Sequence, residues 1–451
     1  MSNWKLHTPN GVNDILPDEC AVKKEIESTI WSVFSSIGYK EVETPTFEYY
    51  DCYLGLSGQI SQEHMFKFFD EQGRILALRP DFTTSIARMA ATKVANSDKP
   101  QRYLYTGNVY RVEQTQGARQ REFTQSGIEL IGSYSPAADA EVISAAMEAV
   151  LAVGIEEFSM EIGQIAFFNG LVKQAGLDEQ SIEKLRERID SKDSVGIKTI
   201  TDKLDIDDNI KNLMIDLPYL FGGEEVFKKA YVDGLNEESK NALDNLKRIY
   251  ELLCLYGFEK YVSIDLGMLE SIDDYTGSIF KCYTHGVGFP ICAGGRYDNL
   301  MGQFGDNKGA VGAAIGINRL ISVLSDKEVH DVSASLVFAE KNAEGIAYDI
   351  AYNLRVNGCL VEMYIGDGDY KAAEEYSKGK NIGAMLRVFP NGQLMINDFA
   401  KHEIIETTAN EFLGYYDESM MFDEHDHCDC GCDHDHEHEH HHDHCDCGHE
   451  H

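Results

Sequence analysis

The sequence predicts an α+β protein, and changes in hydrophobic period along the 451 residues are the main reason. Apolar residues recur at helical spacing in residues 19–37, whereas residues 102–132 alternate with the period of two that is typical of strands. A charged segment with a helical pattern occupies about 170–260, and strand-like segments resume at 261. These observations together predict a mixed fold with a helical insertion.

The N-terminal elements follow from local signals. Residues 19–37 are expected to form an amphipathic helix that ends at Gly38. Residues 39–51 are rich in β-forming side chains but contain Pro45, so we expect an edge or interface strand. Residues 74–95 predict a strand, a turn at Arg79-Pro80-Asp81, and a helix that begins near Thr83 or Thr84.

Residues 102–132 predict two antiparallel strands joined by a polar loop around Gly117. Period two places Arg111 and Glu113 on one face of the first strand. It also places four residues on one face of the second strand, namely Phe123, Gln125, Gly127 and Glu129. The hairpin would therefore present a row of polar groups with a glycine gap, and a helix is expected from about Ala137 to Val153.

Two glycine-rich stretches follow the insertion. Residues 270–280 read ESIDDYTGSIF and residues 293–300 read AGGRYDNL, and both suggest the wall of a small-molecule pocket. In residues 310–324, Gly312 and Gly316 stand four apart, which would give a helix or turn a smooth face for close packing. The expected boundaries are 1–327 for the main domain, 331–416 for a small α/β unit and 417–451 for a disordered tail.

Composition limits the class of protein. The formal charge is −36, which disfavours polyanions at long range but leaves room for a local basic patch. The N-terminus lacks the basic and apolar pattern of a signal peptide, and no run of eighteen apolar residues occurs. Six cysteines lie scattered through the globular part without paired spacing, as is typical of reduced thiols. We expect a cytoplasmic protein without a membrane segment.

Six separated stretches resemble the catalytic domain of histidyl-tRNA synthetase, a class II aminoacyl-tRNA synthetase. In chain order they are GVNDILP, ALRPDFT, YRVE with RQREFTQSGIELIG, DDYTGSIF, AGGRYDNL and AVGAAIGINRL. The resemblance covers roughly residues 8–325. It implies an antiparallel sheet flanked by helices and a dimer formed through the Pro45 region.

The resemblance also implies roles for residues. The set expected to bind histidine is Asp81, Phe82, Thr83, Gln125, Glu129, Asp274, Tyr275 and Tyr297. The set expected to form a vestigial nucleotide site is Arg111, Glu113, Phe123 and Arg319, with Arg111 at the α-phosphate and an adenine between Phe123 and Arg319. Histidine carries hydrogen-bond donors on its ammonium and imidazole groups, and ionised carboxylates are acceptors only.

One position departs from the synthetase pattern. Synthetases of this family carry an arginine where this chain has Glu270. A carboxylate opposes negative charge that develops on a phosphoryl group, and losing such a contact costs about 2–4 kcal/mol. The motif forms look closer to a second group, the histidyl-synthetase-like regulatory subunits of ATP phosphoribosyltransferase, which act in the first step of histidine biosynthesis and its feedback inhibition. The resemblance therefore implies no catalytic residue, no required cofactor, L-histidine as effector and a short-form catalytic subunit as partner.

Other interpretations remain open at this point. Arg111, Arg119 and Arg121 could serve a nucleotide or pair with carboxylates such as Glu113 and Glu122. Gly294 and Gly295 are expected to admit a ligand, although they could form a bulge, and Tyr275 and Tyr297 could be core aromatics. An active histidyl-tRNA synthetase is the main alternative function, and a metal-handling protein on a synthetase-like scaffold is a third. The 331–416 unit has few basic residues, so we expect a protein contact there rather than tRNA.

The tail combines eleven His, five Cys and alternating acids. Thiolate and imidazole groups at one- and two-residue spacing favour zinc, nickel or copper. The candidate ligands are Cys428, Cys430, Cys432, Cys445, Cys447, His425, His427, His440, His441, His442 and His444. The plain alternative is an acidic, solubilising appendage.

Overall fold

The computed structural model describes residues 4–54, 62–94, 99–112, 120–269, 275–324, 334–399 and 401–420, without the side chains of Gln62 and of residues 415–420. The chain divides into two compact units, 1–329 and 330–451. Within the described ranges, no helix combines the length and apolarity that a bilayer crossing requires.

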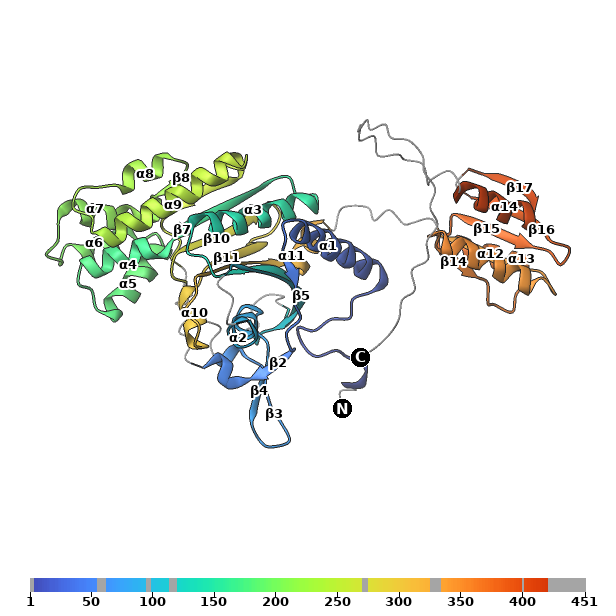
Figure 1. Cartoon of the computed structure of the whole chain (residues 1–451), viewed down its shortest axis with the longest axis horizontal. Coiled ribbons are helices and arrows are strands. Elements are labelled where there is room, and N and C mark those ends of the chain that lie inside the picture. The colour runs from blue at the N-terminus through green and yellow to red at the C-terminus, as the bar shows by residue number, and fades with distance from the viewer. Residues whose placement is uncertain are drawn as a thin grey trace, which may run out of the picture. The chain divides into compact units, whose positions relative to one another are not determined.

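A nine-stranded sheet forms the centre of the first unit (Figure 1). In spatial order its strands are β1 (Lys40–Glu41), β5 (Gln101–Tyr110), β6 (Glu122–Ile131), β12 (Ala310–Gly316), β11 (Cys292–Arg296), β10 (Ser278–Thr284), β7 (Phe158–Gln164), β9 (Val262–Asp265) and β8 (Phe221–Gly222). Most neighbours are antiparallel, but β1 pairs with β5 and β7 pairs with β9 in parallel. The sheet is therefore mainly antiparallel, as expected, with parallel pairings only between β1 and β5 and between β7 and β9.

Helices cover one face of this sheet, here called the back face. They are α1 (Pro17–Ser36), α3 (Pro136–Ala152), α9 (Glu237–Leu255) and α11 (Ile317–Leu324). Ile30 and Phe34 of α1 are fully buried and share a core with Leu104, Ile128 and Leu130 of the sheet. The expected helices at 19–37 and 137–153 are present within two residues of the predicted ends, because apolar spacing and the glycines after them determine both.

The opposite face, here called the front face, carries α2 (Thr83–Lys93) and α10 (Asp298–Gln303). Ile86, Ala87 and Ala90 of α2 pack with Tyr103 and Tyr105 of β5 in a second core. Beside α2 lies a small sheet with the order β2 (Phe47–Tyr49), β4 (Ile75–Leu78) and β3 (Lys67–Phe69) (Figure 1). Pro45 falls between β1 and β2, and each of these strands is at a sheet edge, as its sequence predicts.

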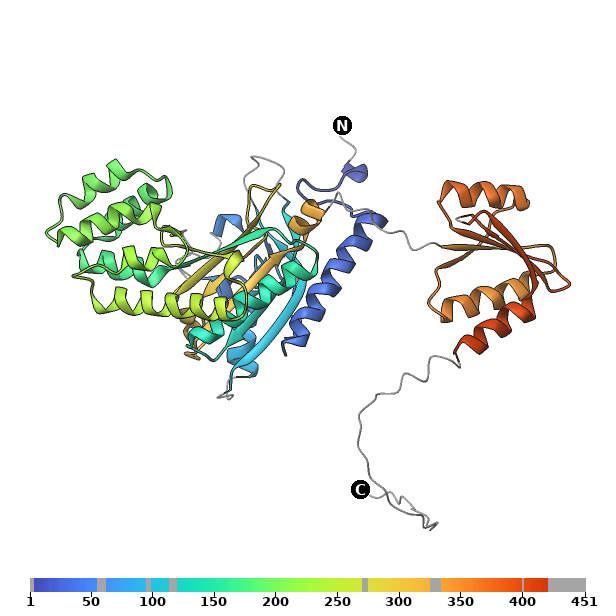
Figure 2. The ribbon, with the colours of Figure 1, turned by 90° about the horizontal axis from the view of Figure 1, so that it is seen from above.

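The helical insertion lies at the end of the sheet formed by β7, β8 and β9 (Figure 2). Besides α9 it contains α4 (Ile165–Gln174), α5 (Glu179–Asp190), α6 (Ser194–Thr201), α7 (Asp208–Asp216) and α8 (Glu225–Ala230). Short 3-10 helices occur at Trp4–Leu6, Tyr50–Tyr53, Gln62–His64, Leu217–Tyr219 and Glu259–Tyr261. The insertion shares one continuous hydrophobic core with the back face of the sheet.

The second unit is a five-stranded sheet with three helices. Its strands, in spatial order, are β14 (Val361–Met363), β13 (Ser335–Ala339), β15 (Ala384–Val388), β16 (Gln393–Asp398) and β17 (Glu403–Thr408). The helices are α12 (Glu344–Val356), α13 (Tyr370–Gly379) and α14 (Ala409–Met420). The sequence pattern does not predict β17, and it places the end of this unit at Tyr416, whereas α14 continues to Met420.

Candidate functional site

A buried carboxyl group lies at the centre of the site. Glu129, on β6, is 1% exposed, and Thr83 Oγ1 donates a hydrogen bond of 2.8 Å to its Oε1. The hydroxyl of Tyr297 donates to Oε2. Burial raises the pKa of Glu129 to about 7, although the bonds from Tyr297 and Thr83 act in the opposite direction. The group therefore changes charge near neutral pH, and a cationic ligand would favour its ionised form.

A second carboxyl group lies at the start of α2. Asp81 Oδ1 accepts a hydrogen bond from the backbone N–H of Thr84, at 3.2 Å. Burial raises the pKa of Asp81, whereas the Thr84 N–H and the positive charge of Arg111 lower it. The negative charge of Asp81 in turn raises the pKa of Glu129. Two acceptor groups near each other in a water-poor region suit a ligand with ammonium or imidazole donors.

The floor of the site is made of residues with little or no side chain. Glu129 is opposite Gly312 in the sheet, and Gly312 is opposite Gly295. A Cβ at Gly312 would lie 1.7 Å from Oε2 of Glu129, and one at Gly295 would lie 2.8 Å from the ring of Tyr275. These glycines belong to regular strands, so the bulge interpretation of Gly295 is wrong. The helix or turn expected around Gly312 is wrong as well, because this glycine lies in β12.

Aromatic residues complete the front face. Tyr297 is 4% exposed, whereas Tyr275 is only partly buried and packs against both hydrophobic cores. Phe82 is 2% exposed and stacks on Tyr105 at a centroid distance of 4.4 Å, beneath the guanidinium of Arg79 at 4.0 Å. Phe82 therefore packs beneath the site, and its expected contact with the ligand stays a prediction.

Gln125 shares the row of Glu129 along β6, as the period of two predicts, and it is partly exposed. The structure thus brings together Asp81, Thr83, Glu129 and Tyr297 on the front face. Asp274 and Glu270 lie outside the described residues, and their expected roles stay predictions.

The residues expected to bind a nucleotide each contact a different part of the protein. The guanidinium of Arg111 lies 5.3 Å from the centre of the Phe123 ring, and its Nε donates to the carbonyl of Pro80 at 2.9 Å. Arg319 instead lies over Phe289 at 5.1 Å and donates to the carbonyl of Pro290. Glu113 falls outside the described residues. The expected placement of an adenine between Phe123 and Arg319 stays a prediction.

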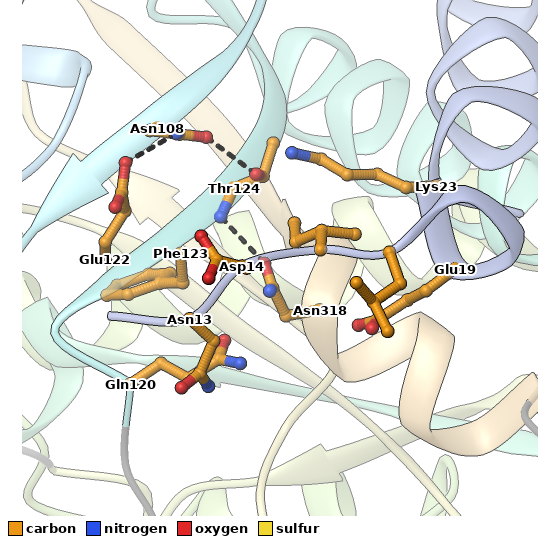
Figure 3. Close-up of a pocket in the computed structure, with 12 residues that line it drawn as sticks. Asn13, Asp14, Glu19, Lys23, Asn108, Gln120, Glu122, Phe123, Thr124 and Asn318 are labelled. Carbon is orange, nitrogen blue, oxygen red and sulfur yellow. Dashed lines mark hydrogen bonds between the residues drawn. The ribbon is translucent and has the colours of Figure 1, made fainter. Parts of the chain in front are cut away.

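A cavity of about 570 Å³ opens near Phe123 (Figure 3). Its wall comes from residues 13–16, the start of α1, β5, β6 and Asn318. Asn108 donates to Glu122 at 2.8 Å and accepts from Thr124 at 2.7 Å, while Asn318 accepts from the Thr124 N–H at 2.8 Å. Asp14, Glu19 and Glu122 contribute three carboxylates against the single ammonium of Lys23. This lining is unfavourable for phosphate, and it contains none of the residues expected to bind histidine.

Asn108 and Asn318 are not among the site residues predicted from the sequence. Their only signal is an amide residue on a predicted strand and another just after Gly316, which is too common to indicate a site. In the described part of the chain, no group of three or more His, Cys, Asp or Glu is arranged to hold a metal ion. All eleven candidate ligands of the tail lie outside the described residues.

The sheet topology, with Asp81, Thr83, Glu129 and Tyr297 gathered on its front face, is that of a protein of the class II aminoacyl-tRNA synthetase type. The family model for histidyl-tRNA synthetase matches residues 11–320. A solved histidyl-tRNA synthetase from a Nostoc species has the same fold, with a TM-score of 0.73 at 22% identity over 92% of this chain and 99% of that one.

Relatives with higher sequence identity have names that specify a narrower role. Proteins called ATP phosphoribosyltransferase regulatory subunit are 44% identical in Acetivibrio thermocellus and 41% identical in Ruminiclostridium cellulolyticum. Each match covers 92% of this chain, and 100% and 99% of the respective relative. A solved structure from Bacillus halodurans, described as an ATP phosphoribosyltransferase regulatory subunit/histidyl-tRNA synthetase, has a TM-score of 0.78 at 31% identity over 86% of this chain and 100% of that one. The chain belongs to the family of ATP phosphoribosyltransferase regulatory subunits, which is similar to histidyl-tRNA synthetase.

Proposed function

We propose that this chain is the regulatory subunit of an ATP phosphoribosyltransferase, binds L-histidine as its effector and does not activate histidine for transfer to tRNA. In this role it supports the first step of histidine biosynthesis and its feedback inhibition. The names of the relatives support the regulatory role. Its partner is a short-form catalytic subunit, and its compartment is the cytoplasm.

The observation that carries the proposal is the environment of Glu129. Its carboxyl is buried, oriented by two hydroxyl donors, and occupies the space that Gly312 leaves free by having no side chain. A histidine imidazole offers an N–H donor to such a carboxyl, and Asp81 offers a second acceptor to the α-ammonium. The fit is to a small cationic amino acid.

The charges at the expected nucleotide site disfavour catalysis. Adenylate formation creates negative charge on the α-phosphate and needs cationic or hydrogen-bond-donor groups beside it. The sequence has Glu270 where the synthetases have arginine, and the cavity beside Phe123 is lined by carboxylates. Both features disfavour a bound nucleotide in the reactive geometry.

Histidine-dependent exchange of pyrophosphate into ATP tests the proposal, with histidine binding followed in parallel by calorimetry. We expect binding without exchange. Exchange at the rate of a synthetase would contradict the proposal, and Glu270→Arg should move the protein toward exchange if the charge at this position decides the activity. Addition of the catalytic subunit should give phosphoribosyltransferase activity that histidine inhibits.

Two further proposals concern assembly. We infer that the chain forms a dimer through the Pro45 region, where β2 exposes Phe47 and Tyr49 at a sheet edge. Light scattering of wild type and of a Phe47→Asp variant tests this, since a charge at the interface should produce monomers. A monomeric wild-type protein would contradict it.

We also infer that the second unit contacts protein rather than tRNA.

We propose that the tail binds zinc, nickel or copper, because its His and Cys residues match the ligand preferences of these ions. Deletion of residues 423–451 should lower the number of metal ions bound per chain and leave histidine binding unchanged. An unchanged metal stoichiometry after deletion would contradict this proposal.

A further inference from the structure

A buried ion pair links the pocket to the back-face helices. Arg296 ends β11, and its Nε and Nη2 contact the two carboxylate oxygens of Asp139 in α3, at 3.1 and 2.5 Å. Arg296 is 6% exposed and Asp139 is 0% exposed. Ser278 donates a third hydrogen bond to the same carboxylate. Burying two charges costs free energy, and their mutual attraction offsets that cost only in part. A contribution to stability alone therefore does not explain this ion pair.

The same arginine closes a ring of hydrogen bonds. Its carbonyl accepts from the Thr276 N–H at 2.7 Å, and the Asp298 N–H donates to Thr276 Oγ1 at 3.0 Å. Nη1 of Arg296 contacts Asp298 Oδ1 at 3.1 Å, which also accepts from the Ala310 N–H at 2.9 Å. The ring therefore fixes residue 276 against residues 296–298.

The two tyrosines of the pocket are direct neighbours of this ring in the chain. Tyr275 precedes Thr276, and Tyr297 lies between Arg296 and Asp298. The side chain of Arg296 reaches α3 on the back face, while the hydroxyl of Tyr297 reaches Glu129 in the pocket. A shift of Arg296 would consequently move a group that contacts Glu129.

We propose that Asp139 and Arg296 are positioning residues that hold Tyr275 and Tyr297 where the pocket binds histidine. This inference rests on the proposed function, because it assigns a role within that same site. The pair lies between α3 and the front-face residues expected to bind histidine.

The effect has a specific electrostatic signature at Glu129. The hydrogen bond from Tyr297 lowers the pKa of Glu129, so displacement of Tyr297 would raise it further. The other groups that act on this carboxyl are Thr83, which donates a hydrogen bond, and Asp81, whose negative charge also raises the pKa. Tyr105 also lies close enough that the charge of Glu129 affects its titration.

The test compares Asp139→Asn with Glu141→Gln. Both residues are on α3, and both carboxylates hold an arginine through two contacts, since Glu141 pairs with Arg102 at 2.6 and 2.7 Å. We expect Asp139→Asn to weaken histidine binding at least tenfold in calorimetry, and Glu141→Gln to change it less than twofold. In carbon-13 NMR of glutamate carboxyl groups, with the Glu129 signal assigned by its loss in Glu129→Gln, Asp139→Asn should shift the Glu129 titration to higher pH and Glu141→Gln should not.

Thr276→Val provides a second variant in case Asp139→Asn does not fold, because it removes one hydroxyl of the ring and no charge. Thr276→Val should also weaken histidine binding and shift the Glu129 titration to higher pH, each by less than Asp139→Asn does. Unchanged histidine affinity and unchanged Glu129 titration in the folded variants would overturn the inference. If wild type does not bind histidine, the proposed function fails, whereas the NMR titration needs no ligand and still decides whether the ion pair positions Tyr297.

Discussion

At the scale of single residues, Glu129 makes stability depend on pH. Burial raises its pKa in the folded protein from 4.5 to about 7, so the folded state holds the proton more tightly than the unfolded state. The stabilisation from this proton is present below pH 4.5 and is lost as pH rises to about 7. We expect Glu129→Gln to lack this pH dependence. Between pH 4.5 and 8, the free energy of unfolding of wild type should therefore fall by up to about 3 kcal/mol relative to that of the variant.

Chemical denaturation at a series of pH values measures this difference. Repeating the series at high salt serves as a control, because salt screens exposed charges much more than a buried carboxyl. Parallel stability curves for wild type and Glu129→Gln across this range would show that Glu129 titrates normally, contrary to the prediction.

Gly312 is the second residue with a sharp prediction. A methyl group at this position would overlap Oε2 of Glu129, so Gly312→Ala should displace the carboxyl and weaken histidine binding at least tenfold. The overpacking should also lower the free energy of unfolding by about 1–3 kcal/mol. Gly288→Ala is the matched control, because no atom lies within 4 Å of the added carbon. Equal histidine affinity in both variants would mean that the ligand binds elsewhere.

The sequence predicted much of the pocket at this scale, because Gln125 and Glu129 follow from period two along one strand. It could not predict that Tyr297 and Thr83 bind the same carboxyl, since these contacts join residues that are far apart in the chain. Arg296 was within a quoted motif, but its partner Asp139 lies on a helix with no distinguishing pattern.

At the scale of elements, α9 depends on its N-cap. The Asn236 side chain accepts a hydrogen bond from the Ser239 N–H at 2.8 Å, and its Nδ2 donates to the carbonyl of Gly170 in α4 at 2.8 Å. Asn236→Ala should therefore lower the free energy of unfolding of the first unit by about 1 kcal/mol, with histidine affinity unchanged. Tryptophan fluorescence reports this unit alone, because Trp4 and Trp31 are the two tryptophans of the chain.

Asp369→Ala is the control for this cap. Asp369 caps α13 of the second unit by accepting from the Ala372 N–H at 3.1 Å. Loss of this cap in Asp369→Ala should leave the midpoint of the fluorescence transition the same as in wild type. A fluorescence midpoint that moves with Asp369→Ala and not with Asn236→Ala would contradict the assignment of these caps to separate units.

Helices were the most predictable elements, because apolar spacing and terminal glycines give local signals for α1 and α3. The strand β12 was not distinguished from a helix, since Gly312 and Gly316 share a face in a helix and in a strand, and the alanines between them favour a helix. The parallel pairings of β1 and β7 could not be predicted either, because strand order depends on contacts between distant segments.

At the scale of the whole molecule, the two units should unfold separately. One hydrophobic core joins the helical insertion to the sheet, whereas the second unit has its own cores. We expect calorimetry to resolve two transitions, and tryptophan fluorescence to follow only one of them. The insertion should melt together with the sheet. Coincident transitions by fluorescence and circular dichroism would contradict this expectation.

The strand order also has a consequence for how the chain is made. β6 and β7 are adjacent in the sequence but separated in the sheet by β12, β11 and β10, which come from the last part of the unit. During synthesis the inner edges of β6 and β7 therefore stay unpaired until residues 278–316 have left the ribosome. Open strand edges pair readily with other chains, and pairings between distant segments form slowly. We expect the nascent chain to depend on chaperones, and truncation before residue 316 to yield aggregates rather than a smaller domain.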